Sequence, residues 1–319
     1  MQLFMELPVN RRGFLRRAAV LGATAALPVH TAATAQHPHP TTGQAADVDL
    51  RWFGVNGWEI AFDDKRVLID PWLTRFPTIG PDGAFLESTP LTVDHAVVDQ
   101  HIHGVDLILI THGHFDHIAD VPYILSRFPD ARVVGTETHI HLLTAMGVAE
   151  RQVIWVRGGE LLQFDGFTVE VVPSLHSLDE NHRYLFPGTM TTRPQPPRTI
   201  ADLIEGGTLA YQVTIGDRLR VFNTGAANLI ERACTGLRPD VAILSYTRAP
   251  GTSRYLERAL ELLDRPRIVV PSHHDDLETP LAQGPTINAQ LMNEFTEAVR
   301  AVDPNSTVLT PRHLEVIPL

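Results

Sequence analysis

The chain of 319 residues is poor in cysteine and in positive charge. Its single cysteine, Cys234, has no partner for an internal disulfide, and we expect it to be a small buried apolar residue. Lys and Arg number 26 against 37 Asp and Glu, which gives a formal net charge of −11. Because phosphate binding depends on clustered Lys and Arg, this acidic balance argues against a nucleic-acid-binding protein.

The amino-terminal segment lacks the long apolar run that a membrane anchor needs. Two arginines at residues 11–15 (RRGFL) precede an apolar stretch, residues 18–27, that is too short to cross a bilayer about 30 Å thick. Residues 33–35 (Ala-Thr-Ala) then offer a processing site. The pattern predicts a twin-arginine (Tat) signal peptide at residues 1–35, a flexible leader at residues 36–48, and export to the periplasm or beyond in a bacterium. Without the signal peptide, which contributes +3, the chain carries −14, and we expect no transmembrane span after processing.

We expect one globular domain at residues 49–319. The chain is 44% hydrophobic and 20% charged, which is ordinary for a globular protein. Short apolar or alternating runs predict strands at about 49–54, 58–62, 66–70, 106–111, 132–135, 152–156, 167–173, 208–215, 219–223, 241–245, 267–271, 307–310 and 313–318. Longer periodic runs predict helices at about 117–128, 137–146, 227–235, 253–264 and 286–302. Strands mixed with helices predict the α/β class.

Two segments, residues 72–104 and 177–206, carry scattered Pro and Gly and only weak periodicity. Loops of this length in a compact domain are usually functional or disordered. Because the second segment begins directly after His176, we expect it to border a substrate pocket. A plain surface excursion is the alternative.

The most informative segment is Thr111–His117 (THGHFDH), which places three histidines and one aspartate directly after the buried-strand pattern of residues 106–110. A tight loop at a strand end directs its side chains into one small volume. Imidazole nitrogen and carboxylate oxygen are the ligands that zinc and similar divalent metals prefer. A metal with an open coordination position makes hydroxide from water near neutral pH. The segment therefore predicts a catalytic metal site.

The same segment resembles the H-x-H-x-D-H signature of the metallo-β-lactamase superfamily, and four further landmarks follow the order of that family. They are the opening strand pair at residues 50–60, the strand end at residues 67–72 (VLIDPW), Pro173-Ser174-Leu175-His176, and Pro271-Ser272-His273-His274-Asp275. The resemblance is to the lactonase-like subgroup, which includes phosphodiesterase-like hydrolases. It implies an αββα sandwich, in which two mixed β-sheets pack face to face and helices cover both outer faces.

The resemblance also implies the ligands of two metals. The first metal is expected at His112, His114 and His176, and the second at Asp116, His117 and His273. Zinc is the first choice of metal, with manganese or iron as alternatives. The remaining histidine pairs, such as His101 with His103 and His139 with His141, match no family motif, and we expect exposed or capping roles for them.

The chain departs from the family at the position of its metal-bridging aspartate, where it has Ala226. Alanine has no donor atom, and the amide of Asn228, two residues on, would be a weak substitute. The second ion is therefore expected to bind more weakly than the first. Asp70, at a strand end, either supports the metal loop from behind or simply forms the turn before Pro71. We expect His274 to line the pocket.

The resemblance implies a hydrolase in which a metal-bound hydroxide attacks an ester, lactone or related bond of a small-molecule substrate. Asp116 would orient the hydroxide as well as bind metal. The proton donor is not readable from the motifs, and the candidates by position are His182, His274, Asp275 and Asp276. Two alternatives stay open: a phosphodiesterase for lipid or nucleotide-like substrates, and a non-catalytic metal-binding or ligand-binding protein. The sequence does not predict the oligomeric state.

Overall fold

The computed structural model of the protein describes residues 48–247 and 252–319. The expected signal peptide and residues 36–47 of the expected leader lie outside the described residues. Val48, the last residue of the expected leader, is the first residue of β1. None of the described helices has the length and apolarity that crossing a membrane requires.

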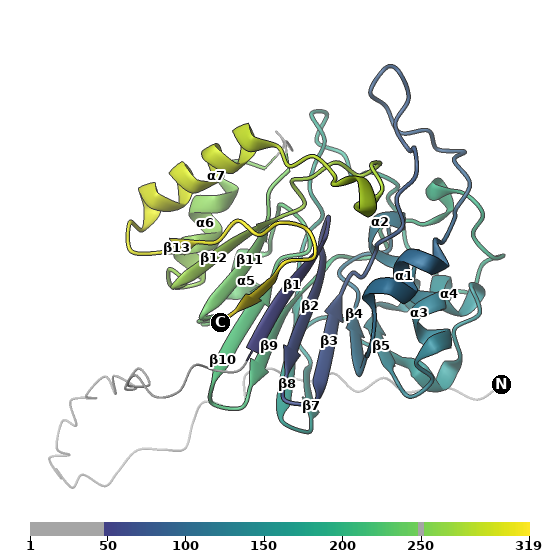
Figure 1. Cartoon of the computed structure of the whole chain (residues 1–319), viewed down its shortest axis with the longest axis horizontal. Coiled ribbons are helices and arrows are strands. Elements are labelled where there is room, and N and C mark those ends of the chain that lie inside the picture. The colour runs from purple at the N-terminus through teal and green to yellow at the C-terminus, as the bar shows by residue number, and fades with distance from the viewer. Residues whose placement is uncertain (1–47, 248–251) are drawn as a thin grey trace, which may run out of the picture. The chain divides into compact units, whose positions relative to one another are not determined.

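The described residues form two seven-stranded mixed sheets (Figure 1). The first sheet has the strand order β14 (Val316–Pro318), β1 (Val48–Gly54), β2 (Gly57–Phe62), β3 (Lys65–Ile69), β4 (Leu107–Leu109), β5 (Arg132–Gly135), β6 (Val153–Trp155). The second has the order β13 (Thr307–Val308), β12 (Ile268–Ser272), β11 (Val241–Ser245), β10 (Leu219–Asn223), β9 (Leu209–Ile215), β8 (Phe167–Pro173), β7 (Leu161–Phe164). Strands β3 to β6 and β10 to β13 run parallel, and the other neighbours are antiparallel.

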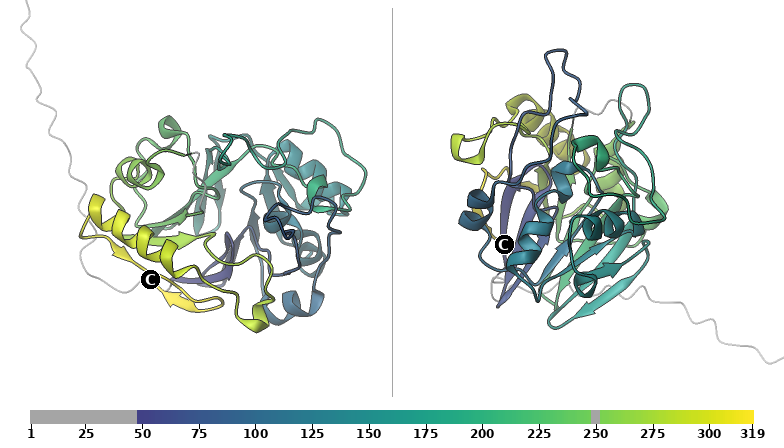
Figure 2. Two further views of the ribbon diagram at one scale, coloured as in Figure 1. Left: turned by 90° about the horizontal axis from the view of Figure 1, so that it is seen from above. Right: turned by 90° about the vertical axis from the view of Figure 1, so that its right-hand side faces the viewer.

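Helices cover the outer face of each sheet, as the two views of Figure 2 show. The first sheet carries α1 (His95–His101), α2 (Phe115–Ile118), α3 (Val121–Arg127) and α4 (Glu137–Ala145). The second carries α5 (Glu231–Cys234), α6 (Tyr255–Leu262) and α7 (Ala289–Val302). Short 3-10 turns occur at Glu150–Gln152, Ile200–Asp202 and Leu281–Gln283. The expected αββα sandwich is confirmed.

The alternation of side chains along each strand explains the four layers. In β3, Val67 and Ile69 face the core between the sheets, whereas Leu68 faces the helices. In β4, Leu107 and Leu109 face the same central core and Ile108 faces outward. Because both faces of these strands are covered, they are apolar throughout, as parallel strands in α/β proteins usually are. Cys234 is buried in the outer core under α5 to α7, as expected.

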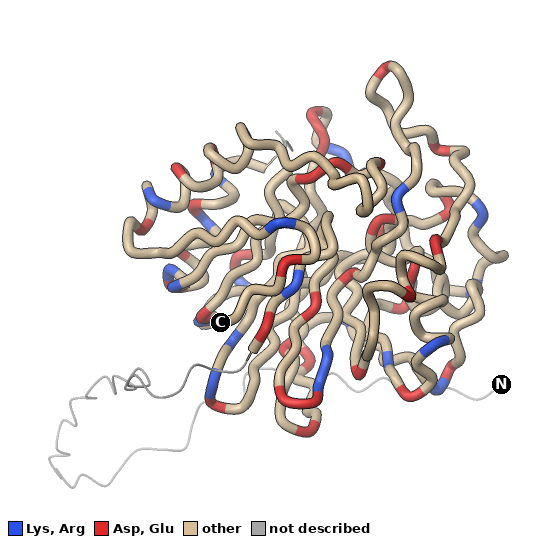
Figure 3. The backbone as a smooth tube through the Cα atoms, in the orientation of Figure 1, with Lys and Arg blue, Asp and Glu red and all other residues tan. Residues whose placement is uncertain are grey.

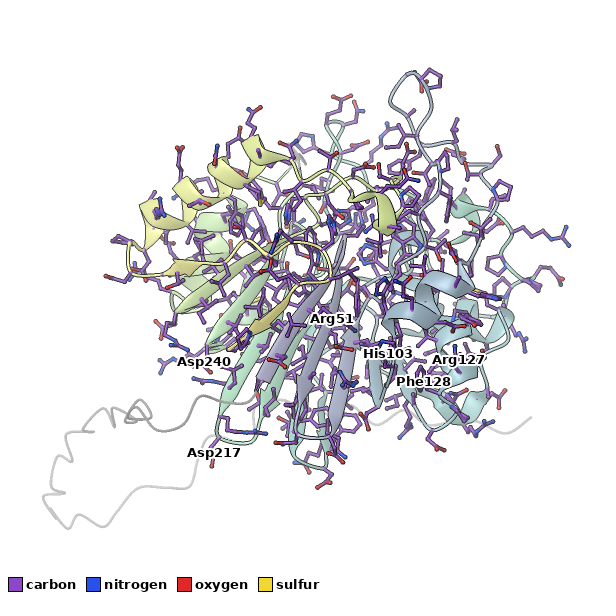
Figure 4. The ribbon with its side chains drawn as sticks, in the orientation of Figure 1. Arg51, His103, Arg127, Phe128, Asp217 and Asp240 are labelled. Carbon is purple, nitrogen blue, oxygen red and sulfur yellow. The ribbon has the colours of Figure 1, made fainter. Side chains whose placement is uncertain are left out.

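A hydrogen bond from Arg51 helps to hold α1 against the first sheet. Arg51 of β1, labelled in Figure 4, donates to Glu59 at 3.1 Å and to the carbonyl oxygen of His101, the last residue of α1, at 2.7 Å. His103, also labelled there, is exposed, as expected.

Three sequence-based assignments of structure were wrong, and one strand was missed. The segment 72–104 contains α1, which begins where Asp94 caps the amides of Ala96 and Val97. The helix expected over 117–128 is two helices, because α3 begins anew at Val121 with Pro122 in its first turn, a position that suits proline. The helix expected over 227–235 is only Glu231–Cys234. The strand β7 was not expected.

Candidate metal centre

All the predicted ligands lie at the carboxyl ends of strands on one edge of the two sheets. The segment Thr111–His117 follows β4, His176 follows β8, and His273 directly follows β12. Parallel strands deliver their carboxyl ends to the same edge, where loops of both sheets meet. Gly113 is needed in the first loop because a Cβ at this position would lie 2.3 Å from the carbonyl oxygen of Ile204.

His112, His114 and His176 form a first group that could hold a metal ion. One ring nitrogen from each lies within 4.8 Å of the others. Their ring centroids are 4.6 to 4.7 Å apart, and the ring planes are steeply inclined to one another. Three nitrogens that converge in this way leave a fourth position open, which is the arrangement of a catalytic zinc site.

Asp116, His117 and His273 form a second group, whose ligand atoms also lie within 4.8 Å of one another. The Oδ2 atom of Asp116 lies 3.5 Å from Nε2 of His117 and 3.3 Å from Nε2 of His273. The ring centroids of His112 and His117 are 3.7 Å apart, so the two groups are neighbours. The structure thus brings together all six residues that the resemblance implied.

Hydrogen bonds to three of the five rings indicate which of their nitrogens is free for a metal. The Nδ1 atoms of His176 and His117 lie 2.8 Å from the carbonyl oxygen of Ser177 and 2.7 Å from the carboxylate of Asp70. Nε2 of His114 lies 2.9 Å from the carbonyl oxygen of Leu185. Because these oxygens only accept, the three ring nitrogens beside them carry the protons, and the opposite nitrogens keep their lone pairs.

The site fits a divalent metal. Nε2 of His117 is fully buried and has no hydrogen-bond partner among the described residues. A buried nitrogen without a partner is rare in folded proteins, and a bound metal ion would satisfy its lone pair. The far-side hydrogen bonds are those expected of metal-binding histidines, whose second nitrogen is held by a carboxylate or carbonyl.

Burial and neighbouring charges act differently on the two groups. Burial, helped by the positive charge of neighbouring histidines, holds the pKa of His112 and of His114 well below the ordinary value. Burial also acts on His117, but the carboxylates of Asp116 and Asp70 outweigh it and raise its pKa. For Asp116, burial opposes ionisation, yet His117 and His273 lower the pKa on balance. The histidines of the first group are therefore held neutral, whereas the second group contains the ionised Asp116 beside a histidine whose protonated form the carboxylates favour.

Asp70 supports the metal loop from behind. One carboxylate oxygen accepts from the backbone N–H of Thr111 at 2.7 Å. The other contacts the Thr111 hydroxyl, the side-chain amide of Asn56 at 2.8 Å, and His117. Asp70 also has a φ of 42°, which is unusual for a residue other than glycine. Of the two expected roles, the contacts favour the supporting one over a simple turn.

Ala226 and Asn228 lie in the loop after β10. The side chain of Asn228, the expected substitute ligand, is engaged in other hydrogen bonds. The amide nitrogen of Asn228 donates to the carbonyl oxygen of His176 at 3.1 Å, and its oxygen accepts from the amide of Leu229 at 2.9 Å. Both polar atoms are thus engaged, and Asn228 fixes the backbone of the His176 loop. Ala226 is buried.

Of the four candidate proton donors, two are held by other residues, one is held neutral by burial, and one is exposed. Asp275 accepts from the amide of Val55, from Arg75 and from His313, and Asp276 accepts from residues 278 and 279 of its own turn. His274 stacks on Trp52 with ring centroids 4.7 Å apart, and burial lowers its pKa to about 4. His182 is exposed, and no contact in the described part of the chain links it to the metal-binding groups.

Sequence reasoning missed three residues that shape the site. Arg75 pairs with Asp275 at 3.2 Å, and both side chains are fully buried. His313 contacts Asp275 at 2.8 Å. The backbone oxygen of Glu205 accepts from the N–H of Gly113 at 2.9 Å, inside the metal loop. None of these residues stands in a recognisable motif, because each is brought to the site by a contact distant in sequence.

A cavity of about 700 Å³ opens beside the second group. His273, His274 and Thr247 line it together with residues from two later segments and Ile79: Asp275, Asp276, Leu277, Glu278, Thr286, Ile287, Asn288, Ala289 and Leu291. Among the described residues of this lining there are three carboxylates and no Lys or Arg. This volume is within the usual range for small-molecule sites.

The comparisons with known proteins define the class. The sequence pattern of a family described as the β-lactamase superfamily domain matches residues 49–273. The chain belongs to this superfamily, in its metallo-β-lactamase-fold form.

Individual relatives are similar to the chain at a moderate level. A UPF0173 metal-dependent hydrolase from Polynucleobacter asymbioticus is 25% identical over 77% of this chain and 80% of its own length. Another from Methanopyrus kandleri is 26% identical over 74% of this chain and 87% of its own length. Together with the superfamily, these relatives identify the chain as a metal-dependent hydrolase.

Solved structures bear on the fold. Igni18, a metallo hydrolase from Ignicoccus hospitalis, matches with a TM-score of 0.55 and 22% identity over 85% of this chain and 97% of its own. An isothiocyanate hydrolase from Delia radicum gut bacteria matches with a TM-score of 0.55 and 17% identity, covering 85% of this chain and 99% of that chain.

Proposed function

We propose that the protein hydrolyses an uncharged ester or lactone, using a divalent ion held by His112, His114 and His176. Zinc is the first choice because three imidazoles with one open position suit it, and manganese or iron are alternatives. The ion, when bound, supplies a nucleophile from water near neutral pH and polarises the bond to be cleaved.

The observation that carries the choice of substrate is the lining of the 700 Å³ cavity. Burial opposes the ionisation of Asp275 and Asp276, but hydrogen bonds and the charge of Arg75 lower the pKa of both. Glu278 adds a third carboxylate, and Arg75 offsets part of the charge of Asp275. Without a basic side chain among the described lining residues, the cavity repels an anionic phosphodiester more than a neutral ester. Arg248 follows Thr247 in the sequence but lies outside the described residues. The test below therefore includes a variant that removes its positive charge.

Asp116 has the position and charge to orient the attacking water. Its carboxylate lies between His117 and His273 and is ionised at neutral pH, so it can accept a hydrogen bond from water. Because its pKa is held low, Asp116 is suited to orienting the water and is a weak acceptor for its proton.

The test uses protein reconstituted with Zn²⁺ and two matched chromogenic substrates, 4-nitrophenyl acetate and bis(4-nitrophenyl) phosphate, with γ-butyrolactone as a cyclic ester. We expect the protein to hydrolyse the ester and the lactone, and we expect a chelator to abolish this activity. In His112→Ala the kcat/KM should fall by about 100-fold or more. His182→Ala is the control and keeps the wild-type rate, because this side chain is exposed and no contact among the described residues links it to the metal-binding groups. A higher kcat/KM for the phosphodiester contradicts the proposal, and its loss in Arg248→Ala would assign that preference to Arg248. Bound metal with no turnover of any substrate would favour the non-catalytic alternative.

We also propose that the protein is exported by the Tat route to the periplasm or beyond. The support is the pattern of paired arginines, short apolar stretch and small-residue site at residues 1–35. The acidic charge of the remainder argues against binding to an anionic membrane surface. Lys and Arg are scattered over many elements rather than gathered on one (Figure 3).

A further inference from the structure

Glu205 is a buried carboxylate for which the proposed chemistry gives no role. It lies in the loop between the 3-10 turn Ile200–Asp202 and β9, and its exposed fraction is 7%. The described residues provide no Lys, Arg or His ion pair for it. From the described part of the chain its carboxylate accepts two hydrogen bonds, from the amide of Gly207 at 2.9 Å and from the hydroxyl of Thr208. A buried charge without a counter-charge is costly, so its retention calls for a compensating partner.

The backbone around Glu205 connects it to both loops that carry the first group of histidines. Its carbonyl oxygen accepts from Gly113, the residue between His112 and His114, at 2.9 Å. Thr208, which donates to the carboxylate, accepts through its own carbonyl oxygen from the amide of Ser174 at 2.9 Å, two residues before His176. Glu205 is therefore joined, through its own backbone and that of Thr208, to the two segments that bring the first group together.

The carboxylate of Glu205 lies near enough to act electrostatically on His176, a residue of the first group. It also acts on Tyr184, whose ring centroid lies 5.8 Å from that of His176.

The two groups differ in the number of carboxylates at or behind their ligands, and this difference suggests a function for Glu205. The second group contains Asp116 and has Asp70 directly behind His117. The first contains three imidazoles and no carboxylate. A divalent ion bound there keeps its full charge in a buried site, where charge interactions are stronger than in water.

We propose that Glu205 is the electrostatic partner of the ion in the first group, acting as a positioning residue from behind the ligands. The attraction between the ion and the carboxylate offsets part of the free energy that burying each charge costs. The carboxylate does not coordinate the ion. Partners behind the ligands typically contribute about 10-fold to 100-fold to metal affinity. This inference rests on the proposed metal centre but not on the nature of the substrate.

The test is a titration of metal-free protein with Zn²⁺ against a competing chelator, which reads the affinity of the tightest ion without any substrate. In Glu205→Gln the first ion binds about tenfold more weakly, because the side chain keeps its shape and loses its charge. Thr208→Val is the matched control: it removes the hydroxyl that donates to Glu205 but keeps the charge, and its affinity stays within about threefold of wild type. Equal losses in the two variants, or an unchanged affinity in Glu205→Gln, overturn the proposal.

Thermal unfolding of the metal-free protein provides a second readout. Removing an uncompensated buried charge leaves the Tm of metal-free Glu205→Gln equal to or above that of wild type. A merely structural role lowers it instead, and that result overturns the proposal. If Glu205→Gln does not fold, Glu205→Asp retains the charge and must bind the ion within about threefold of wild type, and a tenfold loss there counts against the proposal. A wild-type protein that binds no ion refutes the metal centre itself, whereas one that binds an ion but hydrolyses no ester refutes only the proposed substrate.

Discussion

The carboxylate of Asp70 lies 2.7 Å from Nδ1 of His117, and both side chains are fully buried. The N–H of His117 donates to this carboxylate, which leaves Nε2 free to face the second metal-binding group. The same carboxylate oxygen also contacts Thr111 and Asn56. Asp70 thus fixes the ring orientation of a proposed ligand and the backbone of the loop that carries the others.

Asp70→Asn is expected to lower the affinity of the second group for its ion by about tenfold. An amide offers one acceptor oxygen where three donors converge, so His117 loses its fixed tautomer. Zn²⁺ titration of the metal-free variant measures the loss. Asp120→Asn is the control, since Asp120 is an equally buried carboxylate that accepts from the amides of Leu73 and Thr74. Asp70→Asn with wild-type affinity for both ions would show that the hydrogen bond does not tune the metal.

Much of the fold could be predicted because strand patterns are local. The alternation at residues 67–69 and 107–109 fixes which side chains face the central core, and the structure follows it. The helix at His95–His101 was missed although Asp94 stands where a helix cap is expected. Its short length and its position in a Pro-containing and Gly-containing stretch hid the signal.

The six metal-facing residues could be found because four stand in one short motif and two follow recognisable strand ends. The partners behind them could not. Arg75 meets Asp275 across 200 positions of sequence, and Glu205 meets Gly113 across a separation that no local pattern encodes. The sequence suggested Asp275 and Asp276 as proton donors, but only the packed structure shows that their oxygens are occupied by other residues.

Export is expected to depend on Arg11 and Arg12. Replacing both by Lys should trap the precursor in the cytoplasm, because the Tat route requires the arginine pair. Cell fractionation of the native host measures the amount of processed protein outside the cytoplasm. The matched control is the double replacement of Arg16 and Arg17 by Lys, which leaves the first pair intact. Equal export of both double variants would remove the Tat assignment.

Acid is expected to destabilise the fold partly through His139. Burial lowers the pKa of this histidine to about 4, and its ring bridges the amide of Thr136 and the carbonyl oxygen of Glu205. Because the folded-state pKa lies below the unfolded value of about 6.5, the unfolded chain binds a proton first as pH falls. The contribution of His139 is therefore complete above about pH 6.5 and is lost progressively down to about pH 4, by about 3 kcal/mol.

Urea unfolding between about pH 4 and pH 8 tests this dependence. His139→Gln keeps a donor and an acceptor but does not titrate, so its free energy of unfolding should fall less steeply than that of wild type between about pH 6.5 and 4. Other buried histidines titrate equally in both proteins, which makes the difference between the two curves specific to His139. Parallel curves would show that the ring is protonated in the fold at its ordinary pKa.

The loop around Ala226 lies between the two segments that carry the first group. A Cβ on Gly225 would lie 2.3 Å from Thr111, and the amide of Ala227 donates to the hydroxyl of Ser177 at 2.8 Å. Ala226 therefore stands beside both His112 and His176 without offering a donor atom. The amide of Asn228 and the carboxylate of Asp275 are held by other groups. Among these neighbours, no free carboxylate bridges the two groups.

This arrangement predicts one tightly bound ion per chain. Two divalent ions about 3.5–4 Å apart repel with four times the energy of two unit charges, and two-metal sites need anionic ligands to offset this. Asp116 is the only carboxylate among the six metal-facing residues. The first ion is held by three imidazoles and, as we propose, by the charge of Glu205, whereas the second should be removed by dialysis. Ala226→Asp should retain two ions after dialysis by metal analysis, and Ala226→Asn, of similar size but neutral, should retain one. Two equally tight ions in the wild-type protein would contradict this prediction and would require another group to move into the bridging position.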